Sequence, residues 1–124
     1  MSQHHPAPPL LLVRAPHGGT RECDITRTPF TIGRMPDNDL CLEDPAVSAH
    51  HARIVQVQKV WFLEDLSSTN GSFVNEQRID RRQLRDTDAL RFGTHRVVFR
   101  EKTGSAAEPA IAGELLVADK TMVV

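Results

Sequence analysis

Short apolar stretches that alternate with polar residues recur along most of this chain, and turn-forming residues separate them. A period of two is typical of β-strands that bury one face, and turn signals every ~8–12 residues favour a sandwich. No window of about 12 residues shows the 3.6-residue apolar period of an amphipathic helix. The sequence therefore predicts an all-β protein, an antiparallel β-sandwich. The expected strands are 10–15, 21–26, 30–34, 40–42, 51–57, 60–66, 73–74, 78–79, 89–92 and 96–99.

The length of 124 residues fits one domain with a substantial core. Composition divides the chain into a Pro- and His-rich tail over 1–8, a folded domain over 9–101, and a linker with an apolar tail over 102–124. The first tail is expected to be disordered and the linker flexible. The apolar run that follows Pro8 is too short for a signal peptide or a membrane span, so a cytoplasmic protein without membrane contact is expected.

The formal net charge is −1, which gives no general attraction to nucleic acid, and nucleic acid is not expected as a partner. Any recognition of phosphate must then come from a local cluster of donors. The two cysteines, Cys23 and Cys41, lie within apolar alternations. They are expected to be small buried side chains in a reduced protein, with a disulfide as the alternative.

Four polar segments between the expected strands consist of groups suited to an anion. They are 33–34, 48–51, 67–71 and Asn75. Arg34 offers a planar fork of donors, and Ser48 and Thr69 offer hydroxyls. We expect the four segments to share one rim of the sandwich. This inventory suits one phosphate and a stretch of peptide backbone, and it lacks a nucleophile with a base behind it.

A phosphate monoester carries a charge of about −1.5 to −2 and three acceptor oxygens, so its binding needs donors in fixed positions. Arg34 can engage two oxygens at once, and Ser48 and Thr69 can each donate one O–H. The backbone N–H groups of Ala49 and Asn70 can complete the set. Three or four charge-assisted hydrogen bonds, less the entropy of ordering a peptide, support an affinity near the micromolar range.

The order of these segments on an all-β background resembles the forkhead-associated (FHA) domain family over about residues 10–101. The matching stretches are Phe30-Thr31-Ile32-Gly33-Arg34, Asn38-Asp39-Leu40-x-Leu42, Val47-Ser48-x-x-His51-Ala52-x-Ile54, Leu66-x-Ser68-Thr69-Asn70-Gly71-Ser72-Phe73-Val74-Asn75 and Leu84-x-Asp86-x-Asp88-x-Leu90-x-Phe92-Gly93. The resemblance implies an eleven-stranded β-sandwich of the SMAD/FHA type, with the ligand bound by loops at one end. It also implies phosphothreonine-dependent binding of a partner protein in Ser/Thr kinase signalling.

The resemblance assigns a role to each site residue by its position in the motif. The residues expected to contact the phosphate are Arg34, Ser48 and Thr69. Those expected to bind the ligand backbone are Asn70 and, through its N–H, Ala49. Those expected to shape the loops without touching the phosphate are Gly33, His51, Gly71 and Asn75. No catalytic residue, metal or cofactor is implied.

Two positions depart from the pattern of the family. Ala49 stands where many members carry a basic residue or Asn, so only the backbone N–H remains there for a ligand. Asn75-Glu76 stands where the family often has Asn-Gly. A Glu with positive φ would be strained, so the sequence predicts a different turn geometry at Asn75-Glu76.

Three other functions use some of the same residues. Ser48 and His51, with Asp44 or Asp65, contain the atoms of a hydrolase triad, although no nucleophile elbow is present. A sandwich that binds partners without phosphate is the main alternative to phosphothreonine binding. The third alternative, a metal site, would draw on His50, His51 and His95. Adjacent residues on a strand point to opposite faces, which makes the first two poor co-ligands.

Two hypotheses concern selectivity and the C-terminal tail. Members of this family usually discriminate at the third residue after phosphothreonine, and segments 35–38 and 67–68 are the expected walls of that pocket. Thr121 has Val124 as its third following residue, so a phosphorylated tail would be a ligand for the same chain or a second copy. A linker of about 20 residues has the reach. The alternatives are a tail cut from a longer protein and a strand added to a sheet edge.

Overall fold

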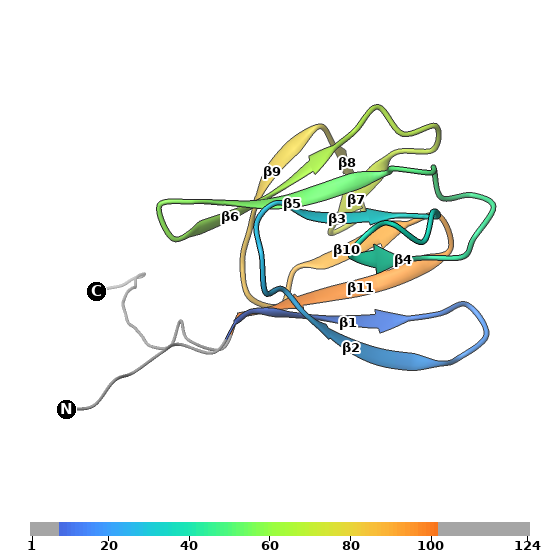
Figure 1. Cartoon of the computed structure of the whole chain (residues 1–124), viewed down its shortest axis with the longest axis horizontal. Coiled ribbons are helices and arrows are strands. Elements are labelled where there is room, and N and C mark those ends of the chain that lie inside the picture. Colours follow the sequence, from blue (N-terminus) through green and yellow to red (C-terminus); the bar gives the residue numbers. More distant parts are fainter. Residues whose placement is uncertain (1–7, 102–124) are drawn as a thin grey trace.

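Eleven strands and no helix form the part of the chain that the structure, a computed structural model, describes, which is residues 8–101 (Figure 1). The strands are β1 (Leu10–Arg14), β2 (Thr20–Asp24), β3 (Phe30–Gly33), β4 (Leu40–Cys41), β5 (Ala52–Val57), β6 (Val60–Asp65), β7 (Ser72–Val74), β8 (Gln77–Ile79), β9 (Arg81–Leu84), β10 (Ala89–Phe92) and β11 (His95–Arg100). Sheet A has six strands in the order β2-β1-β11-β10-β7-β8, and sheet B has five in the order β4-β3-β5-β6-β9. The expected eleven-stranded β-sandwich is confirmed.

Apolar residues at alternate positions of the strands fill the space between the two sheets. Along β11, Val97 and Phe99 are fully buried, whereas Arg96 and Arg100 are exposed. The same alternation places the other large buried side chains, which include Leu11, Ile32, Ile54, Leu63, Leu90 and Phe92. Burying such residues is the main source of stability for a sandwich, and it gives the loops at the strand ends a rigid frame.

The loops that follow β3, β4 and β6 gather at one end of the sandwich, on the right in Figure 1. Strands β3 and β4 are parallel, and β3 and β6 both pair antiparallel to β5, so all three run toward this end. Backbone hydrogen bonds join the loops: the N–H of Arg34 donates to the Ser48 carbonyl at 3.0 Å, and that of Met35 donates to the Ala49 carbonyl at 3.3 Å. The fold thus brings together segments far apart in sequence.

Strand β9 is the one strand that the alternation did not predict. It pairs with β6 at the edge of sheet B, and among its residues Leu84 alone is buried. An edge strand with one apolar contact carries little periodic signal.

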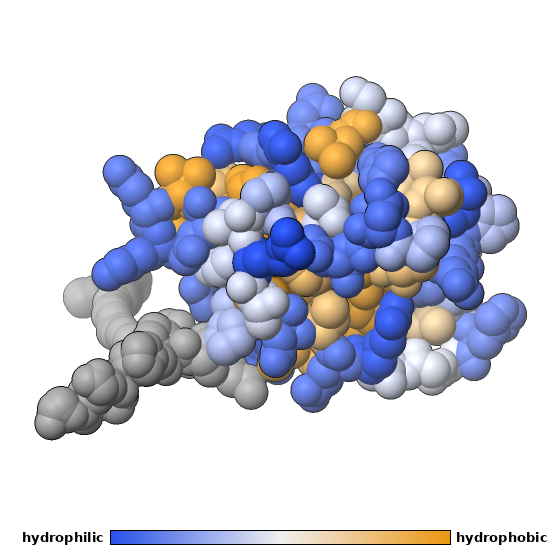
Figure 2. All heavy atoms as spheres, viewed as in Figure 1, coloured by the Kyte–Doolittle hydropathy of each residue, from blue (hydrophilic) through white to orange (hydrophobic). Residues whose placement is uncertain are grey.

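Figure 2 shows a largely hydrophilic face of the molecule, with apolar colour over the β5–β6 hairpin and in a hollow near the centre of the view.

The β7–β8 turn adopts the geometry that the sequence argued against. Asn75 has a φ of 50° and Glu76 a φ of 68°, so the prediction of a different turn geometry is wrong. Asn75 offsets the strain with its side chain, because its Nδ2 donates to the Asp88 carboxylate at 3.0 Å and its Oδ1 accepts the N–H of Ala89 at 3.0 Å. Glu76 adds an exposed ion pair with Arg91 at 3.4 Å.

Both cysteines are free thiols, and both are half-buried rather than fully buried as expected. Cys23 packs against the core, and burial raises the pKa of its thiol.

Within residues 8–101 no helix is long and apolar enough to cross a membrane. The hypotheses about residues 1–7, about the tail after Glu101 and about Thr121 lie outside the described residues.

Candidate functional site

Arg34 directly follows β3, and one side of its guanidinium is anchored. Its Nε donates to the Val47 carbonyl at 3.0 Å. Its two terminal nitrogens, Nη1 and Nη2, make no hydrogen bond or ion pair with any residue in the range 8–101. Because the guanidinium is planar, fixing Nε also fixes the plane in which the two terminal nitrogens donate. Arg34 therefore presents an oriented pair of donors at the rim.

The hydroxyl oxygen of Ser48 accepts the backbone N–H of Thr69 at 3.0 Å, which joins the β4–β5 and β6–β7 loops. Since a hydroxyl has one proton and two lone pairs, this bond leaves the Ser48 proton available to a ligand. The side-chain hydroxyl of Thr69 and the backbone N–H of Ala49 take part in no hydrogen bond within the described chain. Three separate donors thus lie close to the Arg34 fork.

A hollow of about 270 Å³, here called the rim hollow, is lined by Arg34, Pro45, Ala46, Val47, Ser48, Ala49, Thr69 and Asn70. Asn70 spans it, because its Nδ2 donates to the Ala46 carbonyl at 2.8 Å while its Oδ1 remains an acceptor. No Asp or Glu is among the lining residues. The rim hollow therefore combines several N–H and O–H donors with the positive charge of Arg34.

His51 is completely buried and bonds to both the β4–β5 loop and the β6–β7 loop. Its Nδ1 accepts the backbone N–H of Ser48 at 3.0 Å, and its Nε2 donates to the Gly71 carbonyl at 2.9 Å. A ring nitrogen that accepts an N–H carries no proton, so the proton lies on Nε2. The ring also meets Phe92 edge to face, with centroids 5.6 Å apart.

Gly33 lies where the β4–β5 loop passes close to the end of β3. A Cβ at this position would overlap the Ala49 carbonyl and approach Nδ2 of Asn38 to 2.7 Å. Asn38 is itself buried, and its Nδ2 donates to the carbonyls of Met35 and Ala49, both at 2.8 Å. Glycine at position 33 thus permits the loop contact that places Ala49 at the rim hollow.

Asp44 anchors the base of the β4–β5 loop to the β10–β11 turn. Its carboxylate accepts the backbone N–H of Thr94 at 2.9 Å and that of Ala46 at 2.8 Å. The Thr94 hydroxyl and Nδ1 of His95 also bond to it. Burial alone would raise the pKa of Asp44, but the hydrogen bonds from Thr94, Ala46 and His95 hold it well below its usual range.

Asp65 organises the β6–β7 loop in the same way. It accepts the N–H of Ser68 at 3.0 Å and the hydroxyls of Ser68 and Ser72 at 2.6 and 2.7 Å. Burial opposes ionisation of Asp65, yet these serine hydrogen bonds keep its pKa below the ordinary value. The Ser68 oxygen in turn accepts the N–H of Gly71 at 2.9 Å, which fixes the loop beside Asn70.

The structure brings three of the four anion-suited segments to one rim and leaves the fourth elsewhere. Strand β7 leads away from the rim, and Asn75, which follows it, bonds to Asp88 and to Ala89 at the start of β10. The expectation that Asn75 shares the rim is therefore wrong. Of the expected selectivity walls, Asn38 and Ser68 are buried, whereas Met35 is 42% exposed.

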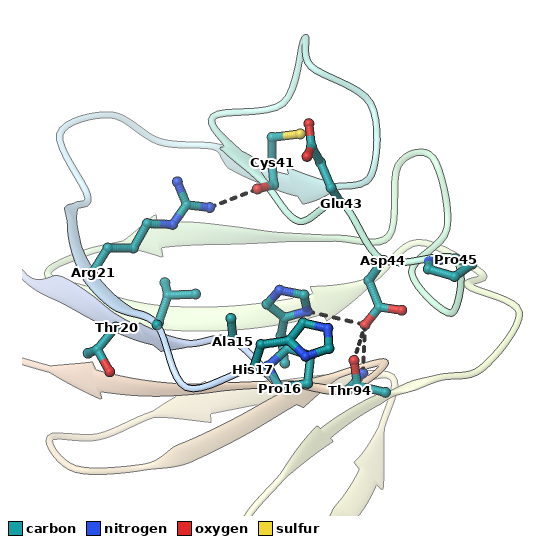
Figure 3. A pocket seen from close by; sticks show the side chains of 13 residues that line it. Ala15, Pro16, His17, Thr20, Arg21, Cys41, Glu43, Asp44, Pro45 and Thr94 are labelled. Carbon is teal, nitrogen blue, oxygen red and sulfur yellow. Dashed lines mark hydrogen bonds and ion pairs between the residues drawn. The ribbon is translucent and has the colours of Figure 1, made fainter.

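A second and larger hollow, of about 900 Å³, opens between the β1–β2 turn and the β4–β5 loop. Figure 3 shows Arg21 at one side, donating to the Cys41 carbonyl, and Asp44 bonded to Thr94 at the other. Pro45 borders both hollows. The polar groups of Arg21 and Asp44 are thus already used within the protein, unlike those at the rim hollow.

The histidines proposed as metal ligands have separate surroundings. His50 bonds to Asp37 at 3.1 Å on the surface, His51 lies in the core, and His95 bonds to Asp44. No cluster of three metal-ligating side chains occurs among residues 8–101. His51 also has both ring nitrogens bonded to backbone groups, so neither is free to act as a base on the Ser48 hydroxyl.

Sequence reasoning missed the supporting residues Asn38, Asp44 and Asp65. The sequence suggests Asp44 and Asp65 only as members of a triad, and Asn38 only as part of a family motif and of a selectivity wall. The residues that Asp44 binds, Thr94 and His95, lie about 50 positions away in sequence, so no local pattern could identify the contact. For Asp44, the one signal in the sequence is its place directly before Pro45 and just after the short apolar stretch 40–42, because Asp-Pro favours the start of a turn.

Comparison with known proteins identifies one family. The family model of the FHA domain matches residues 30–93. Among curated proteins, the chain is 34% identical over 90 residues to the glycogen accumulation regulator GarA of Mycobacterium tuberculosis, which covers 73% of this chain and 55% of that protein. The chain thus spans about half the length of the curated relatives it matches first.

Solved structures show the same fold. Mycobacterium tuberculosis EmbR in complex with a low-affinity phosphopeptide matches with a TM-score of 0.68 and 31% identity, over 79% of this chain and 26% of that one. The FHA domain of FhaA, complexed with the intracellular domain of Rv3910, matches with a TM-score of 0.68 and 33% identity. That match covers 74% of this chain and 99% of the FhaA domain.

Proposed function

This chain belongs to the FHA domain family, and from that premise we propose that its rim hollow binds the phosphothreonine of a partner protein. FHA domains are phosphothreonine-dependent interaction modules of Ser/Thr kinase signalling. In this chain Arg34, Ser48 and Thr69 are assigned to the phosphate, and Asn70 and the N–H of Ala49 to the backbone of the ligand. The partner is a protein phosphorylated by a Ser/Thr kinase, and the proposed place of action is the cytoplasm.

One observation carries this proposal: the donors of the rim hollow are held in place by bonds that leave their ligand-facing atoms unused. Arg34 is fixed through Nε, and Ser48 is fixed through its oxygen. Donors that are oriented before the ligand arrives lose less entropy when it binds. With no Asp or Glu lining the hollow, a doubly charged phosphate meets no negative side chain there that would repel it.

The supporting residues explain how two loops keep this geometry. His51 bonds to Ser48 and to Gly71, and so connects the loop of the proposed phosphate ligand Ser48 to the loop of Thr69 and Asn70. We therefore assign His51, Gly33 and Gly71 to the shape of the site. Asn75 is assigned to the β7–β8 turn instead.

Catalysis is not proposed, because FHA domains are interaction modules and His51 has no free nitrogen for the Ser48 hydroxyl. The alternative function is binding of a partner without phosphate. EmbR was solved with a phosphopeptide, and FhaA with the intracellular domain of another protein. The EmbR complex supports binding of a phosphorylated segment by this chain, and the FhaA complex supports binding of another protein.

Chemical-shift mapping of the amide-labelled chain with a phosphothreonine peptide tests where the ligand binds. We expect the amides of Arg34, Ala49 and Thr69 to shift first, because they lie at the rim hollow. Shifts confined to Thr20, Arg21 and His95 would place the ligand in the larger hollow and contradict the proposal. The unphosphorylated peptide is the control, and equal shifts with both peptides would favour phosphate-independent binding.

A further inference from the structure

Four arginines and a phenylalanine form one cross-strand row on the outer face of sheet A. Arg14 on β1 is opposite Arg96 on β11, and Arg96 is opposite Arg91 on β10. Phe73 on β7 continues the row between Arg91 and Arg78 on β8. The five strands are neighbours in Figure 1 and in the sheet order. We call these residues the arginine row.

Most of the positive charge in the arginine row has no counter-ion. Arg91 stacks on the Phe73 ring at 4.1 Å and pairs with Glu76 at 3.4 Å. Arg14, Arg78 and Arg96 form no ion pair within the part of the chain described. Like charges directly opposite on neighbouring strands are destabilising. In a chain whose net charge is −1, this local excess favours an anionic partner.

One end of the arginine row lies beside Gly71, the residue that follows the rim hollow's Asn70. The side chain of Arg78 lies over Gly71, where an added Cβ would come within 2.6 Å of its Nε. Gly71 directly follows Asn70, which lines the rim hollow. At the other end, Arg14 is the last residue of β1 before the β1–β2 turn at the same end of the sandwich. A ligand that leaves the rim hollow past Gly71 would therefore meet the row.

We propose that the arginine row binds an acidic segment of the partner that adjoins the phosphothreonine. This inference rests on the proposed function and names the class of ligand: a phosphothreonine with acidic residues on one side. The row crosses five strands, and the four gaps of about 4.8 Å between them add up to roughly 19 Å, which an extended chain spans with about six residues. Carboxylates of such a segment would pair with Arg78, Arg96 and Arg14.

The shape of the charged surface favours one extended peptide over a nucleic acid. The next outward-facing row on sheet A contains Leu12, Val98 and Ala89, and it ends on β2 with Glu22. The positive charge therefore occupies a single line, one residue wide, with apolar and acidic neighbours. A duplex needs positive charge over a broader surface, since its two phosphate backbones are far apart.

Binding of the complete chain to four peptides tests the inference. Two phosphothreonine peptides carry a flank of six acidic residues. In the first the flank precedes the phosphothreonine, and in the second it follows it. The other two peptides are their neutral matches, with Gln and Asn in place of the acidic residues. We expect one acidic flank to tighten binding roughly three- to tenfold over its neutral match at low salt, the size of two or three exposed ion pairs. At 0.5 M salt this gain should largely disappear, because exposed charges are screened.

A double substitution, R14Q with R96Q, should make the affinities for the acidic-flanked peptide and its neutral match nearly equal, so that their ratio is close to one. The matched control is R85Q with R100Q, which removes two exposed charges at the far end of the domain and should preserve the ratio. Equal affinities of acidic and neutral peptides for the wild-type chain would overturn the inference. The inference would also be overturned if both double variants lost the preference for the acidic-flanked peptide to the same extent.

Failure of the proposed function would look different, because then even the neutral phosphopeptide would bind no better than its unphosphorylated form. A 20-base-pair DNA duplex serves as a further probe. If the wild-type chain bound the duplex through Arg14 and Arg96 and showed no effect of the acidic flanks, the row would be a nucleic-acid site and the peptide inference would be wrong.

Discussion

The Ser48 hydroxyl oxygen accepts the backbone N–H of Thr69 at 3.0 Å, although the two residues lie 21 positions apart. This bond closes the rim hollow between two loops that carry different ligand-binding groups. It uses one lone pair of the Ser48 oxygen and leaves the Ser48 proton to donate. The contact thus joins the architecture of the site to the chemistry that we propose for it.

Substitution S48A should weaken phosphothreonine binding far more than it weakens the fold. A hydrogen bond to a charged group contributes about 1.5–3 kcal/mol, so the affinity should fall by roughly tenfold or more. The free energy of unfolding should fall by only about 1 kcal/mol, because water can reach the exposed Thr69 that loses its partner. Calorimetric titration and urea unfolding measure the two effects. T26A, at an exposed position after β2 whose hydroxyl makes no hydrogen bond within the described chain, is the control and should change neither.

Substitution H51A should destabilise the domain and weaken the ligand together. It leaves the Ser48 N–H and the Gly71 carbonyl without their partner, and it removes a fully buried ring from Phe92. We expect a loss of about 2–4 kcal/mol in the free energy of unfolding. The adjacent His50 is exposed and bonds only to Asp37, so H50A should have little effect. Equal stability of the two variants would contradict the structural role of His51.

Glycine substitutions test the close approach at the end of β3. G33A should distort the contact between β3 and the β4–β5 loop, because the new Cβ would overlap the Ala49 carbonyl. Both stability and phosphopeptide affinity should fall. Gly19 has no neighbouring atom within 4 Å of such a Cβ and no positive φ, so G19A should be neutral or slightly stabilising. Thermal unfolding of both variants checks this difference in stability. A G33A variant that unfolds at the wild-type temperature would refute the prediction.

Asp44 should make stability depend on pH in the acid range. Its pKa is lowered in the folded state, so its contribution is fully present above the ordinary Asp value of about 3.9. It is lost as the pH falls below that value toward the folded-state pKa. D44N should cost about 2–4 kcal/mol near pH 7, since an amide cannot accept all these hydrogen bonds, and should flatten stability below pH 4. Urea unfolding of the wild-type chain and D44N from pH 7 to pH 2 measures how the free energy of unfolding of each depends on pH. D37N, at an exposed site, should keep the wild-type slope.

Ten of the eleven strands were predictable from apolar alternation and turn residues, and β9 was not. Strand β11 buries every second residue, and β5 does so over Ala52 and Ile54, which produces a period of two. Strand β9 lies at an edge of sheet B with one buried residue, so its sequence gives no such signal. Register and edge position come from pairing with distant strands, and local sequence does not specify them.

The loop residues of the site were predictable from type and family resemblance, whereas their supporting contacts were not. Arg34, Ser48 and Thr69 carry the donors that a phosphate needs, and that chemistry is visible in the sequence. The anchoring of the loop by Asp44 depends on Thr94, which lies 50 positions away in sequence. Asn75 was misplaced for a similar reason, because spacing alone does not tell where the three-residue strand β7 ends in space.

The most direct test of phosphothreonine recognition is a calorimetric titration of matched phosphothreonine and threonine peptides into the wild-type chain and R34A. We predict that the wild-type chain binds only the phosphorylated peptide and that R34A loses this binding while its unfolding transition is retained, because Arg34 is exposed at the end of β3. Equal affinity of the wild-type chain for the two peptides, or full phosphopeptide affinity in R34A, would contradict the proposed function.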